Sequence, residues 1–164
     1  MLRLGTRASK PRRTIVVSLS AILALGIAFA PAALAGGGVR SKVLRMVNAT
    51  RDHHDLHTLR MDRSLAGDAL RHTRRMIRKN AIYDPPNLTL TRILQDEPWD
   101  NVGASVVGCA DTLSALHSAF MHDPPHRDIL LDPRLRRIGI GVVEVDSQNA
   151  CGRHSLWATE LFYG

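Results

Sequence analysis

Two stretches in the first half of the chain place apolar residues three or four positions apart, which is the spacing of a helix with one buried face. The first stretch covers residues 39–54. The second begins after Asp62, whose carboxylate is suited to cap a helix N-terminus, and it ends before Asn80. A third helix is predicted over 112–122, with Asp111 as its cap. Each of these helices needs an apolar surface against which its stripe can be buried.

Three other segments have the alternating or continuous apolar pattern of β-strands and could supply that surface. They cover residues 101–107, 138–145 and 154–164. The last segment has large apolar side chains on both of its faces, for example Trp157 on one and Phe162 on the other. A strand of this kind is covered on both sides. The pattern therefore predicts a sheet with helices packed on both faces.

Residues 1–35 differ from the rest of the chain and predict a secretory signal peptide. A basic segment without any acid precedes an apolar run over 14–30, and a small-residue Ala-Leu-Ala step ends at Ala35. We expect cleavage after Ala35, a short flexible lead-in over 36–39 and one domain over 40–164. A retained anchor is the alternative, because the apolar run of 17 residues is at the short limit for crossing a bilayer. The prediction is a secreted, extracellular protein with no membrane span in its mature chain.

Removal of this segment changes the charge of the protein and the class of partners to expect. The whole chain has 22 basic and 15 acidic residues, a formal net charge of +7. Five of the basic residues and none of the acidic ones lie in residues 1–35, which leaves the mature chain at +2. The one dense basic stretch, 71–79, is typical of the solvated face of a helix. A nucleic-acid partner needs a clustered basic surface, so none is expected.

The only two cysteines, Cys109 and Cys151, both lie in the mature chain. Two cysteines in an exported protein usually form a disulfide, and the alternative is two free buried thiols. A bond that closes a loop of roughly 40 residues would stabilise the fold by about 3–4 kcal/mol. We therefore predict that Cys109 and Cys151 are bonded.

Four segments of the mature chain carry motifs that are similar to those of a known family. They are VNATR at 47–51, LRMDRSLAGDALRHTRRM at 59–76, AFMHDPPHRDILLDPRLRRIGIGVV at 119–143 and LWATELF at 156–162. Together they resemble the bacterial secreted branch of the CAP superfamily, which comprises cysteine-rich secretory, antigen five and pathogenesis-related class one proteins. The resemblance covers residues 40–164. It implies an α+β fold, an α-β-α sandwich in which a small, mainly antiparallel sheet lies between helices, with a central cleft.

The residues that line this cleft in the family are only partly retained here. His126 matches the histidine of the family's Pro-Gly-His-Arg motif. Asp84 stands where the family has its first histidine, while Ala104 and Ser105 replace the glutamate and asparagine of its Gly-Glu-Asn step. Asp123 lies near the position at which a second acid could enter. The resemblance therefore implies a degenerate cleft.

A divalent metal is one use for the remaining groups. Such a site needs about three protein ligands, and Asp84 and His126 could supply two, with His122 or Asp123 as the third. The histidine-rich tract at 53–57 is a second candidate, although histidines near a helix C-terminus are more often exposed residues favoured by the helix dipole. We expect no cofactor and keep a divalent metal as the alternative.

Nucleophilic catalysis is another use, because Ser105, His126 and Asp84 contain the groups of a catalytic triad. The structural alternative places His126 in a turn, since Pro124 and Pro125 are expected to end the preceding helix. In that turn His126 would pair with Asp84 and fix the crossing from helix to strand.

The absence of a glutamate at Ala104 favours a protein that binds over one that catalyses. We predict a secreted, non-catalytic binding or interaction module at or outside the cell surface. Its expected partner is a cell-surface component, a lipid or another small apolar ligand. The alternative is a metal-dependent or hydrolytic enzyme that uses His126 and Asp84 in the cleft.

Overall fold

The computed structural model describes residues 33–86 and 102–164. In chain order the elements are α1 (Ala33–His53), β1 (Arg60–Met61), α2 (Arg63–Lys79), β2 (Gly103–Ala110), α4 (Leu113–His122), α5 (Pro124–Leu130), β3 (Arg137–Val145) and β4 (Ser155–Tyr163). No helix in these two described ranges is both long and apolar enough to cross a membrane. Outside these ranges lie the basic segment and the apolar run over 14–30 of the predicted signal peptide, and also the start of the expected first strand.

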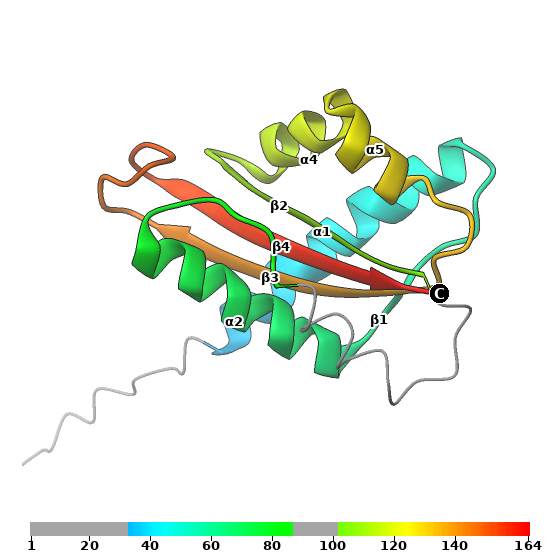
Figure 1. Ribbon diagram of the computed structural model, residues 1–164, viewed down its shortest axis with the longest axis horizontal. Helices are drawn as coiled ribbons and strands as arrows, with labels where there is room; N and C mark the ends of the chain where they lie inside the picture. The colour runs from blue at the N-terminus through cyan, green and yellow to red at the C-terminus, as the bar shows by residue number, and fades with distance from the viewer. Residues whose placement is uncertain (1–32, 87–101) are drawn as a thin grey trace, which may run out of the picture. The chain divides into compact units, whose positions relative to one another are not determined.

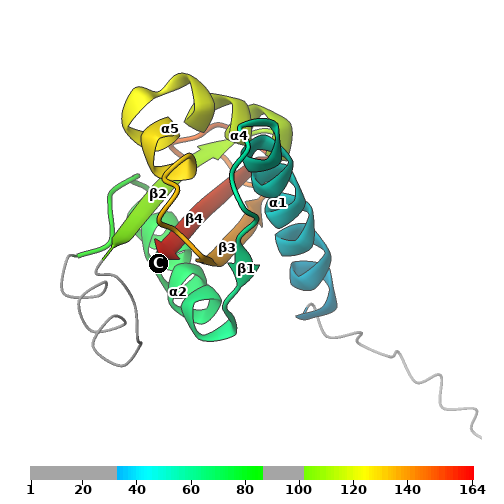
Figure 2. The ribbon, with the colours of Figure 1, turned by 90° about the vertical axis from the view of Figure 1, so that its right-hand side faces the viewer.

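The four strands form one sheet in the order β1-β3-β4-β2 (Figure 1). The short β1 is parallel to β3, whereas β4 is antiparallel to both of its neighbours. Helix α2 covers one face of the sheet, and α1, α4 and α5 cover the other (Figure 2). The predicted α+β sandwich with a mainly antiparallel sheet is confirmed.

The central strand β4 divides the core into two parts. Ala158 and Phe162 face α1, α4 and α5 and belong to the larger apolar cluster. Trp157 packs with Met76 of α2, and Leu161 packs with Leu65 of the same helix. Alternate residues of a strand point to opposite faces, so the prediction that this strand is apolar and covered on both sides is confirmed.

Two glycines of β3 explain how closely α2 lies on the sheet. A Cβ atom at Gly139 would overlap the backbone of Leu65, and one at Gly141 would overlap the backbone of Ala69 and Leu70. Any side chain at either position would push the helix away from the strand. The Ile-Gly-Ile-Gly pattern is therefore a requirement for backbone-to-backbone packing, and no unusual backbone angle is involved.

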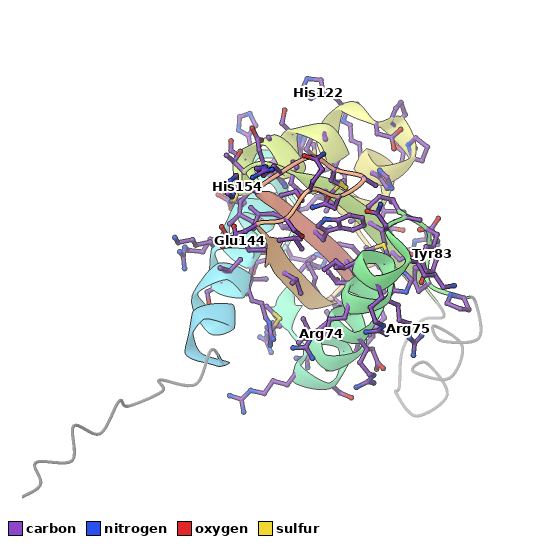
Figure 3. All side chains as sticks on the ribbon, turned by 90° about the vertical axis from the view of Figure 1, so that its left-hand side faces the viewer. Arg74, Arg75, Tyr83, His122, Glu144 and His154 are labelled. Carbon is purple, nitrogen blue, oxygen red and sulfur yellow. A yellow bond between two sulfur atoms is a disulfide. The ribbon has the colours of Figure 1, made fainter. Side chains whose placement is uncertain are left out.

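Helix α2 begins and ends where the sequence predicts. The Asp62 carboxylate accepts a hydrogen bond from the Leu65 amide at 2.9 Å, which satisfies one of the free donors of the first turn. Asn80 closes the helix in the left-handed conformation, with φ 50°. The arginines of the basic stretch are exposed, and Figure 3 shows Arg74 and Arg75 on the outer side of α2. The prediction of a solvated helix face is confirmed.

Other boundaries differ from the prediction. Helix α1 begins at Ala33, so the expected lead-in over 36–39 is helical, because each residue added to an existing helix gains a backbone hydrogen bond. Thr112, not Asp111, caps α4 and accepts from the Ala115 amide at 3.1 Å. Both residue types cap helices well, so the sequence alone does not separate adjacent candidates. Strand β2 extends to Ala110 and therefore includes Cys109.

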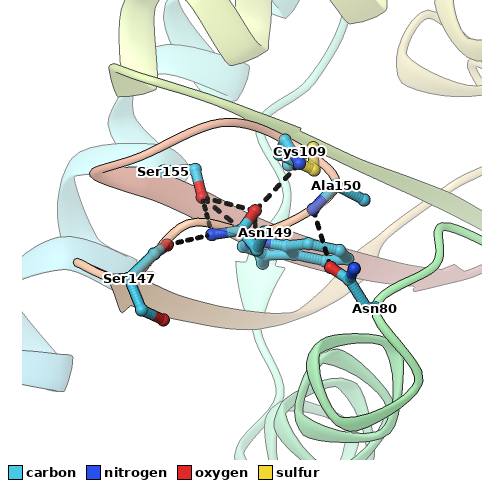
Figure 4. The surroundings of a disulfide bond; sticks show 8 residues. Asn80, Cys109, Ser147, Asn149, Ala150 and Ser155 are labelled. Atoms are coloured by element: carbon cyan, nitrogen blue, oxygen red, sulfur yellow. Dashed lines mark hydrogen bonds between the residues drawn. A yellow bond between two sulfur atoms is a disulfide. The ribbon is translucent and has the colours of Figure 1, made fainter.

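Cys109 and Cys151 form the predicted disulfide, with their Cα atoms 6.1 Å apart. Cys151 lies in the turn between β3 and β4, which Asn149 organises (Figure 4). The Asn149 side chain accepts from the Cys151 amide at 2.8 Å and donates to the Ser147 carbonyl at 2.8 Å. The disulfide ties this turn to the edge strand β2.

Candidate functional site

His126 lies in α5, on the side of the sheet that α1, α4 and α5 cover. Its Nδ1 atom is 2.6 Å from a carboxylate oxygen of Asp123, and its ring lies edge-on to Phe120 at 5.2 Å between centroids. The side chains of His126 and Asp123 are 26% and 47% exposed, so solvent reaches both partners. The expected carboxylate partner was Asp84, and the structure corrects this to Asp123.

The correction follows from what the two prolines do. Pro124 and Pro125 were expected to leave an irregular turn, but they occupy the first positions of a new helix, α5. Proline is well tolerated there because its fixed φ suits a helix and the missing N–H would have no partner within the helix. Asp123 is the N-cap of α5, and its side chain makes no capping bond to the backbone. Its carboxylate instead meets His126 three residues later.

Asp84 lies on the segment that follows α2. Its carboxylate accepts a hydrogen bond from the Ser105 hydroxyl at 3.4 Å. The carbonyl oxygen of the preceding residue, Tyr83, lies 2.7 Å from Nε2 of His72. Burial lowers the pKa of His72, and the charge of Asp84 acts weakly in the opposite direction. Asp84 therefore belongs to a group of polar contacts around the end of α2.

The residues that match the family's cleft positions lie on opposite faces of the sheet. Ser105 is two residues before Val107, which packs with Met76 of α2, so it faces the α2 side. Ala104 shares the opposite face with Val106, which packs in the larger cluster with Phe120. Ser105 thus contacts Asp84, whereas His126 contacts Asp123. These two separate pairs do not form the serine–histidine–aspartate chain of contacts that a catalytic triad needs.

His122 takes part in neither pair. It is exposed near the end of α4, and its Nδ1 atom is 2.7 Å from the Ser118 carbonyl one turn earlier. Across residues 33–86 and 102–164, no three His, Cys, Asp or Glu side chains converge so that they could hold a metal ion. The histidines at 53–57 do not converge on one point. The rings of His53 and His54 contact each other, whereas Nε2 of His57 lies 2.6 Å from the Leu135 carbonyl.

Residues 44–161 match the sequence model of the cysteine-rich secretory protein family, CAP. The chain belongs to this family. No curated protein matches the sequence. Solved structures of three bacterial proteins share the fold of this CAP domain at 20% sequence identity or less.

The first of these is an extracellular protein with an SCP domain from Bacillus anthracis, with 20% sequence identity and a TM-score of 0.59. The match covers 78% of this chain and 41% of that protein. The second is an outer surface protein of Borrelia burgdorferi, with 15% sequence identity and a TM-score of 0.61. The match covers 76% of this chain and 90% of that protein. The third is a cysteine-rich secretory protein of Staphylococcus aureus, with 18% sequence identity and a TM-score of 0.57. The match covers 78% of this chain and 39% of that protein. This chain thus spans less than half the length of two of these proteins. The neighbours with a stated location are extracellular or on the outer surface.

The Asn-x-x-Arg motif of this CAP domain holds the connection between α1 and β1. The Asn48 side chain forms two hydrogen bonds with the backbone of Leu59, at 3.0 and 2.8 Å. The fully buried Arg51 donates to the carbonyls of His57, Leu130 and Asp132 at 3.0, 2.9 and 3.0 Å. The motif therefore positions the segment before β1 against the segment before β3.

A groove lies between α1 and α4, at a place that the resemblance did not predict. It has a volume of about 460 Å³. The residues that line it are Lys42, Arg45, Met46, Ala49, Leu113 and Ser114. The four residues from α1 are three, four and seven positions apart, so they share one helix face. This spacing was visible in the sequence, but the neighbouring stripe of Val43 and Val47 is the one that enters the core.

The sequence pattern also does not predict a buried carboxylic acid that the structure contains. Glu160 is only 2% exposed and lies between Ala158 and Phe162 on the face that packs against α1, α4 and α5. One of its carboxyl oxygens has no hydrogen-bond partner among the described residues. Burial raises the pKa of Glu160 to about 8, so the group is mostly protonated at neutral pH. A single glutamate inside an apolar strand gave no signal that distinguished it from a solvent-facing residue.

Proposed function

We propose that this CAP domain is an exported binding module and that its ligand is an amphiphile with an anionic head and an apolar tail, such as a long-chain fatty acid. The proposal follows the family's secreted character, which the signal-like segment 1–35 supports. The observation that carries it is the groove between α1 and α4. Its volume of about 460 Å³ is in the range of small-molecule sites.

The groove has the two kinds of surface that such a ligand needs. Met46, Ala49 and Leu113 offer apolar area, and burial of an alkyl chain contributes about 0.8 kcal/mol per CH₂ group. Lys42 and Arg45 lie four positions and one position before Met46, and both are exposed. Neither cation forms an ion pair with another described residue. A carboxylate at this end would complete the charge balance.

The helices on both sides of the groove are tied to each other close by. The Thr50 hydroxyl lies 2.7 Å from Nε2 of His117, and these residues follow the groove residues of α1 and α4 along each helix. Burial lowers the pKa of His117, so its neutral form is favoured. This contact supports a groove that is largely formed before a ligand arrives, which reduces the entropy cost of binding.

The pairing of the cleft residues supports binding over catalysis. A general base must reach its proton donor within hydrogen-bond distance, and the carboxylate that contacts His126 is that of Asp123, the N-cap of the same short helix. Asp84 is bonded to Ser105. We therefore assign the cleft residues no catalytic step and place the binding function in the groove.

Displacement of a fluorescent fatty acid by palmitate, with the chain from residue 36 onward, tests this proposal. We expect saturable binding to the wild-type protein and loss of binding in Ala49→Trp, because the indole would fill the groove. Ala119→Trp is the matched control, since Ala119 is an exposed alanine of α4 that does not line the groove. Absence of palmitate binding to the wild-type protein, or equal binding by Ala49→Trp, would contradict the proposal.

A further inference from the structure

A second cavity lies at the other edge of the described fold, where β1 meets the start of β3. It has a volume of about 410 Å³ and is lined by His57, Thr58, Arg60, Arg136 and Arg137. None of its lining residues comes from the groove between α1 and α4. The cavity is therefore separate from the site of the proposed function.

Among the described residues, five line this cavity; three of them are arginines, and none is a carboxylate. The parallel pairing of β1 and β3 places Arg60 directly opposite Arg137. Like charges in directly opposite positions of a sheet are destabilising. Neither arginine forms an ion pair within residues 33–86 and 102–164. The pocket thus concentrates positive charge that no ion pair between described residues neutralises.

Two acidic groups close to the pocket residues in the chain, Asp62 and Asp132, are engaged elsewhere. Asp62 accepts from the Leu65 amide at 2.9 Å and from the Tyr163 hydroxyl at 2.7 Å, and Arg137 acts on it only as a nearby charge that helps lower its pKa. Asp132 is bound by the Arg134 side chain at 2.6 Å, and this contact lowers the pKa of the Asp132 carboxyl. Neither carboxylate lines the pocket.

The third arginine is held in place by backbone carbonyls. Arg136 donates to the carbonyls of Pro133 and Leu135 at 2.5 and 3.1 Å, and the same nitrogen contacts the His57 ring. Since these bonds use only one of its terminal nitrogens, the rest of the Arg136 guanidinium keeps donors that can face a ligand. Pre-positioned donors bind an anion at a lower entropy cost than mobile ones.

Arg51 adds a fourth positive charge behind the pocket. It is fully buried, and one of its terminal nitrogens has no partner among the described residues. Its other nitrogens support the wall of the pocket through the carbonyl of His57 and the segment before β3. Burial lowers the pKa of Arg51, and the charge of Arg136 lowers it further. The charge of Asp132 acts on the Arg51 pKa in the opposite direction. Arg51 thus adds a buried guanidinium group behind Arg60, Arg136 and Arg137.

We propose that this pocket binds a phosphate-bearing ligand, with Arg60 and Arg137 as paired donors, Arg136 as a fixed third donor and the Thr58 hydroxyl as a fourth. Guanidinium groups match the oxygens of phosphate with two parallel hydrogen bonds each. A single carboxylate would neutralise one arginine, whereas a phosphate with two or more charges can bridge the opposed pair. A soluble molecule and a lipid headgroup are the two sources of such a phosphate, and they share this chemistry.

Calorimetric titration of the folded chain with pyrophosphate tests the proposal, and Arg60→Gln/Arg137→Gln is the decisive variant. Removal of two charge-assisted donors should weaken binding by about tenfold or more. Arg74→Gln/Arg78→Gln is the control, because it removes the same charge from exposed positions of α2 and should leave the affinity within about twofold. Equal loss in both variants would show nonspecific attraction and would overturn the proposal.

Sedimentation with phosphatidylglycerol vesicles separates the two phosphate sources. Binding to vesicles that disappears in Arg60→Gln/Arg137→Gln, without pyrophosphate binding, would assign the pocket to a headgroup. If neither probe binds the wild-type protein, the proposal is wrong. Amide chemical shifts of the wild-type protein give a readout that does not depend on the variant folding, and pyrophosphate should move those of residues 57–60 and 136–137. Ala49→Trp should leave pyrophosphate binding unchanged, so the outcome is independent of the proposed function.

Discussion

On one face of the sheet, α2 lies so close to β3 that a methyl group at Gly139 or Gly141 would overlap its backbone. The Thr73 hydroxyl buried there is paired, since it lies 2.9 Å from both the Gly141 carbonyl and the Thr159 hydroxyl, although Nδ1 of the buried His72 has no partner among the described residues. On the other face, the helices leave a groove between α1 and α4, and one oxygen of the buried Glu160 has no partner within residues 33–86 and 102–164. The comparison indicates that the α2 face is the rigid scaffold and that the opposite face has room for a ligand.

Substitution of the glycines should break this comparison most strongly. Gly139→Ala inserts a methyl group into the backbone of α2, which has nowhere to move without losing its contacts, so we expect a loss of about 3–5 kcal/mol in the free energy of unfolding. Gly108→Ala, on the other face, meets the Phe120 ring at 2.7 Å, and a side chain can shift. Its expected cost is about 1–2 kcal/mol. Urea unfolding of both variants measures the difference, and equal costs would contradict it.

Removal of the disulfide tests whether the β2 edge depends on a covalent tie. Cys109 and Cys151 are 42 residues apart in sequence, and loss of such a closure should cost about 3–4 kcal/mol in the chain-entropy model. The double variant Cys109→Ser/Cys151→Ser should therefore melt at a lower temperature than the oxidised wild-type protein. Wild-type protein under reducing conditions is the control and should show a similar loss. An unchanged melting temperature in both experiments would show that the edge is held by packing alone.

Glu160 gives the less satisfied face a pH dependence. Its pKa is raised from 4.5 to about 8, so between these values the folded protein keeps a proton that the unfolded chain has lost. Stability should therefore fall by roughly 1.4 kcal/mol per pH unit as pH rises through this window, or about 3 kcal/mol between pH 5 and pH 7. Glu160→Gln should flatten this slope, whereas Glu144→Gln at an exposed position of β3 should not. Chemical denaturation at several pH values measures it, and parallel slopes for the two variants would refute the role of Glu160.

The smallest effect is expected at the partly exposed pair of His126 and Asp123. Because both side chains reach solvent, their coupling should be at most about 1 kcal/mol. A double-mutant cycle with His126→Ala and Asp123→Ala should detect this coupling. The corresponding cycle with His126→Ala and Asp84→Ala should be additive, since Asp84 contacts Ser105. Coupling in the second cycle and none in the first would restore the pairing expected from the sequence.

The elements that the sequence predicts well are those that depend on local chemistry. Asp62 caps α2 because its carboxylate only needs the amides that follow it, and β4 carries its two-sided apolar pattern in its own residues. The prediction fails where one residue type suits two structures, as with Pro124, which can end one helix or begin the next. The family resemblance predicted the Asn48 and Arg51 motif, but their hydrogen bonds became visible only in the structure.

The candidate sites depend on long-range register, and this explains why they were not predicted. The basic pocket requires Arg60 to stand opposite Arg137, which only the parallel pairing of a two-residue strand brings about. The groove needs the distance and rotation between α1 and α4, which neither helix specifies alone. The small net charge of residues 36–164 does not reveal this local excess of arginine, because the balancing acids lie elsewhere.

The position of β4 has a consequence for how the protein is made. Strands β2 and β3 both pair with β4 and not with each other, yet β4 follows both of them in the chain. During synthesis the two earlier strands therefore have no central partner until β4 itself has left the ribosome, and the hydroxyl of its Tyr163 is also needed to complete the bond at Asp62. Long-range pairing of this kind delays folding. The sheet of this domain can therefore be completed only after β4 has been synthesised.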